Sequence, residues 1–164
     1  MLQTLMRMSE APLPALLAVL IGTGTAPAAS ARSAFDTAAR RAEPAAASAA
    51  AETYLAEITA RGPYKVGDLG SVTVSLTAKA GFHINDQYPY RFKTAAPTEG
   101  VSYPKPVLER ADGHFNEKTA VFELPLVARH SGQFIVGGVL NLSVCSATSC
   151  VVHKERLDVT ITVR

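Results

Sequence analysis

The sequence predicts an all-β fold, an antiparallel β-sandwich of about seven strands. Between residues 52 and 164, apolar side chains recur at every second position over short runs, as in strands with one buried face. Glycine, proline and Asp-Gly turn signals separate these runs, and nothing in this region resembles a long amphipathic helix. About seven short strands over ~110 residues indicate an immunoglobulin-like architecture.

The first two expected strands follow soon after residue 52. Apolar side chains alternate over residues 54–59 until an Arg-Gly-Pro sequence at 61–63 ends the run. A clearer alternation follows over residues 72–79 and ends at Gly81. This second run has one apolar and one polar face, which is typical of an antiparallel strand that packs on a core from one side.

The middle of the domain predicts shorter and less regular strands. Residues 82–93 are rich in aromatic side chains but contain Pro89, which suits an edge strand or a bulged strand. Residues 94–106 carry three prolines and one glycine, so we expect a loop there with a short extended piece. An Asp-Gly turn signal at 112–113 precedes the next regular alternation, which covers residues 120–126.

The last two expected strands, 134–145 and 150–163, form a hairpin with Cys145 and Cys150 on the two sides of its turn. If the two cysteines face each other, the numbers of paired residues add up to 295. In this register the apolar residues of both strands fall on one face, so the pairing is consistent with itself. The cysteines then lie on the opposite, less apolar face, which we expect to be exposed.

The first 51 residues follow a different pattern. Arg7 precedes an apolar run over 13–22, and small residues with Ala-x-Ala-like spacing follow, so residues 1–28 are expected to be a secretory signal peptide. The apolar run is too short for the ~20 residues that span a bilayer, and the exported chain is expected not to span a membrane. Residues 29–51 are rich in alanine and predict a flexible linker, which leaves 52–164 as one domain.

Composition excludes several classes of function. The formal net charge is only +2, and no run of four Lys or Arg residues occurs, so we expect no nucleic-acid partner. The sequence contains no G-x-S-x-G, H-E-x-x-H, P-loop or C-x-x-C motif. Cys145, Cys150 and His153 would suit Zn(II) or Cu(I), but the predicted register turns His153 to the opposite face. We therefore expect no metal and no cofactor.

Cys145 and Cys150 are the only cysteines, and they are the candidate catalytic residues. An exported chain can keep such a pair as a disulfide. In the chain-entropy model a loop of about six residues contributes only ~2 kcal/mol, less than half of what a bridge across the whole domain would give. The pair therefore suits a labile, exchange-active bond better than a staple. We expect the nearby His153 and Lys154 to favour a thiolate.

Three segments resemble the N-terminal periplasmic domain of the DsbD thiol:disulfide interchange family: GFHINDQYPYRFK (81–93), ADGHFNEK (111–118) and GGVLNLSVCSATSCVVHKERLDVTITV (137–163). The resemblance covers roughly residues 52–164 and implies an immunoglobulin-like sandwich. It implies that Cys145 and Cys150 are the reactive pair, the first forming a mixed disulfide and the second resolving it, with the order left open. The family shields its disulfide with a cap loop, and Phe115, beside His114, matches the cap position.

The sequence departs from this family at three points. Four residues lie between the cysteines, one fewer than is usual in the family, and Gly113-His114 replaces the acidic pair before the cap phenylalanine. The family's membrane domain and terminal thioredoxin domain are missing. We therefore expect a separate membrane electron carrier to act beside thioredoxin-like periplasmic partners.

Two functions remain open at this point. The first is an exported, periplasmic thiol-disulfide exchange module, with oxidoreductase-type interchange activity through Cys145 and Cys150. The second is a non-catalytic immunoglobulin-like binding or accessory domain whose disulfide only pins its last hairpin.

Overall fold

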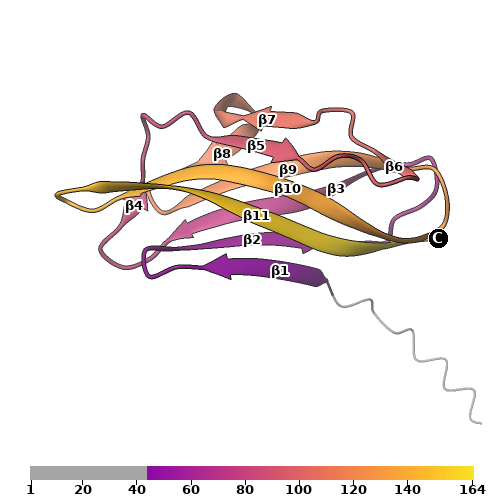
Figure 1. The fold of residues 1–164 in the computed structure, drawn as a ribbon, viewed down its shortest axis with the longest axis horizontal. Coiled ribbons are helices and arrows are strands. Elements are labelled where there is room, and N and C mark those ends of the chain that lie inside the picture. The colour runs from indigo at the N-terminus through magenta and orange to yellow at the C-terminus, as the bar shows by residue number, and fades with distance from the viewer. Residues whose placement is uncertain (1–43) are drawn as a thin grey trace, which may run out of the picture. The chain divides into compact units, whose positions relative to one another are not determined.

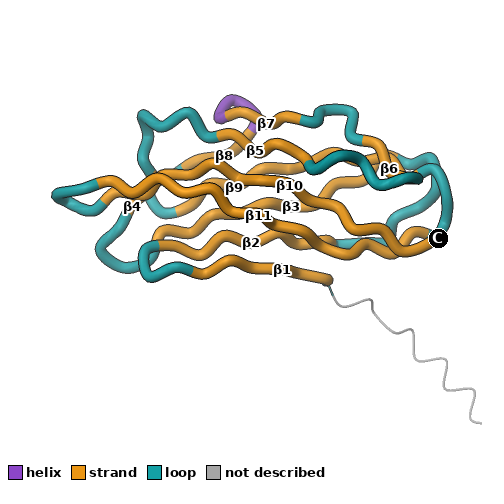
Figure 2. Tube along the Cα trace, in the orientation of Figure 1, coloured by secondary structure: helices purple, strands orange, loops and turns teal. Residues whose placement is uncertain are grey.

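The computed structural model describes residues 44–164, which form two antiparallel sheets (Figure 1). The first sheet contains β1 (Ala45–Ala50), β2 (Tyr54–Ala60), β3 (Leu69–Ala78), β6 (Val101–Ser102), β8 (Gly113–Phe115) and β9 (Thr119–Ala128). The second sheet contains β4 (His83–Ile84), β5 (Arg91–Thr94), β7 (Val107–Glu109), β10 (Gly132–Cys145) and β11 (Cys150–Val163). A 3₁₀ turn, Arg110–Asp112, is the one helical element of the described residues (Figure 2).

The predicted all-β sandwich is confirmed. Strand order in the first sheet is β1-β2-β3-β9-β6, with β8 also on β9, and in the second sheet β11-β10-β5-β7, with β4 also on β10. The described residues contain eleven strands where the periodicity predicted about seven. The surplus arises chiefly from β4, β6, β7 and β8, which are two or three residues long and too short to show an alternation.

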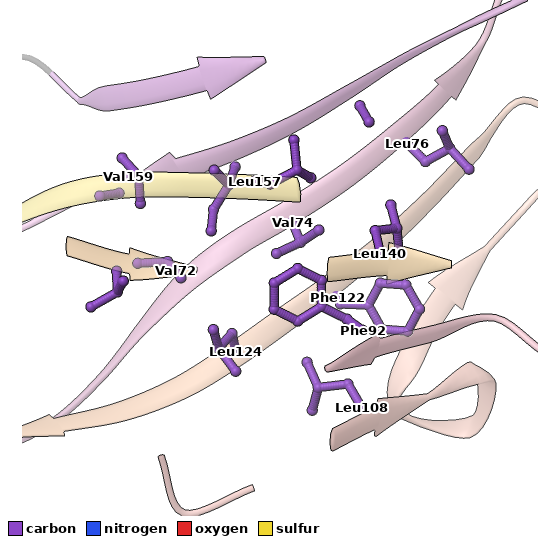
Figure 3. Close-up of a cluster of buried hydrophobic side chains, with 14 of the residues drawn as sticks. Val72, Val74, Leu76, Phe92, Leu108, Phe122, Leu124, Leu140, Leu157 and Val159 are labelled. Atoms are coloured by element: carbon purple, nitrogen blue, oxygen red, sulfur yellow. The ribbon is translucent and has the colours of Figure 1, made fainter. Parts of the chain in front are cut away.

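The core lies between the two sheets. Each sheet turns its apolar face inward, so that Val74 and Phe122 of the first sheet lie near Phe92 and Leu140 of the second (Figure 3). All four of these side chains are at most 1% exposed. The alternation read from the sequence therefore identified the buried face of each long strand.

Strand β1 is built from residues that the sequence assigned to the flexible linker. It pairs with β2 along its whole length, from Ala45 opposite Ala60 to Ala50 opposite Leu55. Alanine has little preference for strands, so the local sequence carries no strand signal there; the exposed edge of β2 supplies the hydrogen-bonding partners. The expected boundary at residue 52 is therefore too late. The expected signal peptide, 1–28, and residues 29–43 lie outside the described residues.

The β10–β11 hairpin has the predicted register. The two strands, of 14 residues each, pair from Gly132 opposite Val163 to Cys145 opposite Cys150, so paired numbers do add up to 295. Gly138 lets β5 approach β10 closely, because a Cβ atom at this position would lie 2.2 Å from the carbonyl oxygen of Lys93. The tip of the hairpin lies at the opposite end of the sandwich from the C-terminus (Figure 1).

Residues 44–164 include no helix of the length and hydropathy that crossing a membrane would require.

Candidate functional site

The two cysteines form a disulfide across the tip of the β10–β11 hairpin. The S–S distance is 1.99 Å and the two Cα atoms are 3.9 Å apart. The Ser146 N–H donates to the Ser149 carbonyl oxygen at 2.7 Å, which makes these serines the hydrogen-bonded pair next to the turn. Cys145 and Cys150 therefore occupy the adjoining non-hydrogen-bonded position, where side chains on paired strands approach most closely. The disulfide lies where the sequence predicted it.

The turn that joins the cysteines has its own hydrogen bonds. The Ser146 hydroxyl accepts from the backbone N–H groups of Thr148 and Ser149, at 3.3 and 3.1 Å. A serine side chain that binds the backbone two and three residues ahead holds a turn in shape without any covalent bridge. The sequence signal for this turn is a serine directly before two turn residues, Ala147 and Thr148.

The two cysteines differ in exposure. Cys145 is 6% exposed, whereas Cys150 is an exposed residue. The expectation that both thiols lie on an exposed face is therefore wrong for Cys145. The physical reason is that β4 pairs with the edge of β10 that β11 leaves free, with His83 opposite Cys145, so Cys145 has a strand on each side. Cys150 lies on β11, which is an edge strand. One end of the disulfide is covered and the other is open to solvent.

Hydrogen bonds anchor residues 83–90, the segment that begins with β4 beside Cys145 and that we call the covering segment. Tyr90 is 1% exposed; its hydroxyl donates to the Ser143 carbonyl oxygen and accepts from the Asn85 N–H at 3.0 Å. The Asn85 side chain also donates to the Ser143 hydroxyl at 3.2 Å. Burial raises the pKa of Tyr90 to about 12, so the phenol keeps its proton near neutral pH and remains a donor. These bonds join the segment after β4 to the strand that carries Cys145.

Replacing Tyr90 by phenylalanine is expected to destabilise this end of the domain. The variant loses the bond to Ser143 and leaves the Asn85 N–H without its phenol acceptor, which should lower the free energy of unfolding by about 1–2 kcal/mol. Urea denaturation measures this loss, and hydrogen exchange at the Ile84 and Asn85 amides should become faster. Tyr88→Phe is the matched control, because the Tyr88 ring packs beside Tyr90 but its hydroxyl takes no part in these bonds. Equal losses in both variants would contradict the anchoring role.

Strand β8 carries both cap candidates, Phe115 and His114, which differ in burial and in contacts. Phe115 is half-buried, with its ring centroid 5.0 Å from that of Tyr90 and 5.4 Å from that of Phe122. The Arg110 guanidinium carbon lies 4.4 Å from the Phe115 ring centroid, within cation–π range. His114 is exposed and pairs with Val121 at the sheet edge. Phe115 is thus held by an aromatic cluster, which His114 does not join.

A hollow of about 400 Å³ lies between β4 and β8, lined by His83, Ile84, Asp86, Arg110, Phe115, Asn116 and Glu117. The Ile84 N–H donates to the Glu117 carbonyl oxygen at 2.8 Å and joins the two walls. Because His83 is also the ladder partner of Cys145, the hollow that Phe115 lines begins next to the covered cysteine. No local sequence pattern connects His83 with Cys145, which is far away in the chain.

The histidine and lysine expected to favour a thiolate lie away from the sulfurs. His153 pairs with Leu142, and its ring packs on Tyr54 with 5.4 Å between centroids, on the opposite face from the cysteines as the register predicted. Lys154 shares the face of Cys150 but is four residues further along the strand, a rise of ~14 Å. His83 is therefore the nearer titratable neighbour of the pair. Within residues 44–164 no three potential ligands gather as a metal site.

No protein-family model matches the chain, and no curated protein matches it. Among solved structures, it is similar to the crystal structure of the N-terminal periplasmic domain of ScsB from Proteus mirabilis, with 15% sequence identity and a TM-score of 0.43. The match covers 71% of this chain and 51% of the other, so the chain spans about half the length of that structure.

Proposed function

We propose that this protein is an exported, periplasmic thiol-disulfide exchange module that acts through the Cys145–Cys150 disulfide. The observation that carries the proposal is the unequal exposure of the two cysteines at the tip of a hairpin. An exposed sulfur admits a partner thiolate, and a covered sulfur next to it is kept for the second step. The proposed partners are thioredoxin-like periplasmic proteins and a separate membrane electron carrier.

The exchange has two steps, each of which forms one S–S bond and breaks one. A partner thiolate attacks the Sγ of Cys150, forms a mixed disulfide and releases Cys145 as a thiolate, which takes up a proton. A second thiolate of the partner then attacks the partner's sulfur in the mixed disulfide and releases Cys150. The partner dithiol is oxidised, and two electrons remain on the cysteine pair. In the opposite direction, Cys150 attacks a partner disulfide and Cys145 resolves the product.

A purely structural role suits this disulfide less well. The hairpin around it is already held by the ladder that pairs all 14 residues of β10 with those of β11, and by the hydrogen bonds of the Ser146 hydroxyl in the turn. A loop of about six residues adds only ~2 kcal/mol in the chain-entropy model. The bond also joins neighbouring strands of one sheet, so it does not connect the two sheets of the sandwich. Its reduction should therefore leave the fold in place, which a reusable exchange site requires.

Phe115 completes the proposal as a cap on the covered side. The Phe115 ring packs against Tyr90, whose hydroxyl donates to the strand that carries Cys145. Phe115 also lines the hollow that extends to His83. In this role Phe115 keeps reagents away from Cys145 and directs attack to Cys150. His114, which is exposed, flanks the cap and contributes no shielding of its own.

The reduction potential of the disulfide tests the proposal. Equilibration of the full chain with a thioredoxin-type dithiol buffer should give a potential more positive than about −300 mV, because structural disulfides lie below that value. Circular dichroism of the reduced protein should retain the β-sheet signal. A potential below about −300 mV, together with no exchange with the dithiol, would support the structural alternative and overturn the proposed function.

A further inference from the structure

The outer face of the second sheet carries four exposed cations in two adjacent rows. In one row, Arg91 of β5 and Lys154 of β11 flank Asn141 of β10. In the next row, Lys93 and Arg156 flank Val139 in the same way. Because side chains of directly paired residues lie on the same side of a sheet, these four cations share one surface. We call this surface the cationic face.

Only half of the cationic face is neutralised within the chain. Arg91 pairs with Glu109 at 3.0 Å and Arg156 pairs with Asp158 at 2.6 Å. Lys93 and Lys154 belong to none of the salt bridges found among residues 44–164. Two exposed ammonium groups on adjacent rows thus remain available to a partner, at positions where the strand ladder fixes their backbone.

The cationic face is continuous with the exposed end of the disulfide. Alternation along β11 places Cys150, Val152 and Lys154 on the same side of the strand. Val152 is 58% exposed, a large apolar side chain between the sulfur and the first lysine. A protein whose cysteine reaches the Sγ of Cys150 along this face therefore covers Val152 and meets Lys154 at ~14 Å from the sulfur.

We propose that the cationic face docks an acidic exchange partner, a protein with an apolar contact beside its reactive cysteine and carboxylates about 10–15 Å from it. This inference rests on the proposed function, because it assumes that a partner attacks Cys150. A nucleic acid fits the face less well, since duplex binding proteins typically neutralise about 6–10 phosphates and only four cations are present.

Two synthetic peptides of equal length test the charge of the partner. Each has one cysteine next to a leucine; one carries three glutamates further along the chain and the other carries three lysines. Stopped-flow measurement gives the rate constant of mixed-disulfide formation with the full-length protein. Each rate is divided by the rate with dithiothreitol, an uncharged thiol, so that a general change in disulfide reactivity cancels.

The charge-reversed protein is Lys93→Glu/Lys154→Glu, and its matched control is Arg61→Glu/Lys65→Glu. The control makes the same change in net charge at the other end of the sandwich, where Tyr64 pairs with Val163. At low salt the first variant should react about tenfold more slowly with the acidic peptide, and the control should react like the wild type. At ~1 M salt, where the Debye length is ~3 Å, the difference should disappear.

Two results would overturn the inference: an equal loss in both variants, which would mean that net charge alone matters, or an unchanged rate in the Lys93→Glu/Lys154→Glu protein. Failure of the proposed function looks different. In that case the wild-type disulfide would resist dithiothreitol and both peptides alike, whatever their charge.

Discussion

A Cys145→Ser variant is expected to form mixed disulfides rapidly through Cys150, whereas a Cys150→Ser variant should react at least about 100-fold more slowly. The reason is that Cys145, at 6% exposure, pairs with β4 on one side and β11 on the other, while Cys150 lies on an edge strand. A reagent reaches Cys145 only after local opening of the β4 segment, and an opening free energy of ~2.7 kcal/mol gives a factor of about 100. The measurement is the rate of reaction of each single thiol with a small aromatic disulfide.

The matched control is the same reaction in concentrated denaturant. There the two thiols should react at similar rates, because neither is covered once the chain is unfolded. The same two variants identify the roles of the cysteines with a thioredoxin-like partner. The Cys145→Ser protein should accumulate a stable mixed disulfide, since it lacks the resolving thiol. Equal rates for both variants under native conditions would contradict the assignment of Cys150 as the attacked sulfur.

Phe115→Ala is expected to have the second-largest effect, and it separates a cap from a packing anchor. In a Cys150→Ser chain, removal of the ring should make Cys145 react about tenfold faster, because the hollow beside His83 opens and the covering segment loses a packing partner. The same substitution should lower the free energy of unfolding by about 2–3 kcal/mol, since Phe115 packs on Tyr90 and Phe122 but is only half-buried.

Two further variants make this result interpretable. His114→Ala removes the exposed side chain next to Phe115, and it should change neither the reaction rate of Cys145 nor the free energy of unfolding by much. Tyr88→Phe is again the control: it keeps the ring that packs on Tyr90 and removes only a hydroxyl that takes no part in the bonds to Ser143 and Asn85. If Phe115→Ala lowers stability while the rate of Cys145 stays at the value of the parent chain, Phe115 is a packing anchor and the cap role is wrong.

The sequence alone was sufficient for features that depend on neighbours along the chain. Alternation with a period of two identified the buried face of the long strands, because the pleat sends successive side chains to opposite sides. The C-terminal hairpin was predictable down to its register, since a tight turn links the strands and a shift by one residue would bury the polar face. That register came from placing the two cysteines opposite each other, and the disulfide confirms this placement.

Features that depend on segments far apart in the chain were settled only by the tertiary structure. The alanines of β1 become a strand because the edge of β2 offers hydrogen-bonding partners, although alanine itself does not favour strands. Cys145 is covered because β4, which is only two residues long, pairs with the end of β10. The surroundings of Phe115 likewise come from Tyr90 and Phe122, which neighbour it in space.

For this protein, then, the sequence by itself determined the class of fold, the pairing of the last hairpin and the position of the two sulfurs. It did so because local periodicity and a short turn carry that information. Only the tertiary structure decided which of the two sulfurs is open to solvent, and which charged side chains share its side of the sheet. Those properties arise where β4 pairs with β10 beside Cys145 and where β10 brings the cations of β5 and β11 into the same rows, and strand pairing determines both.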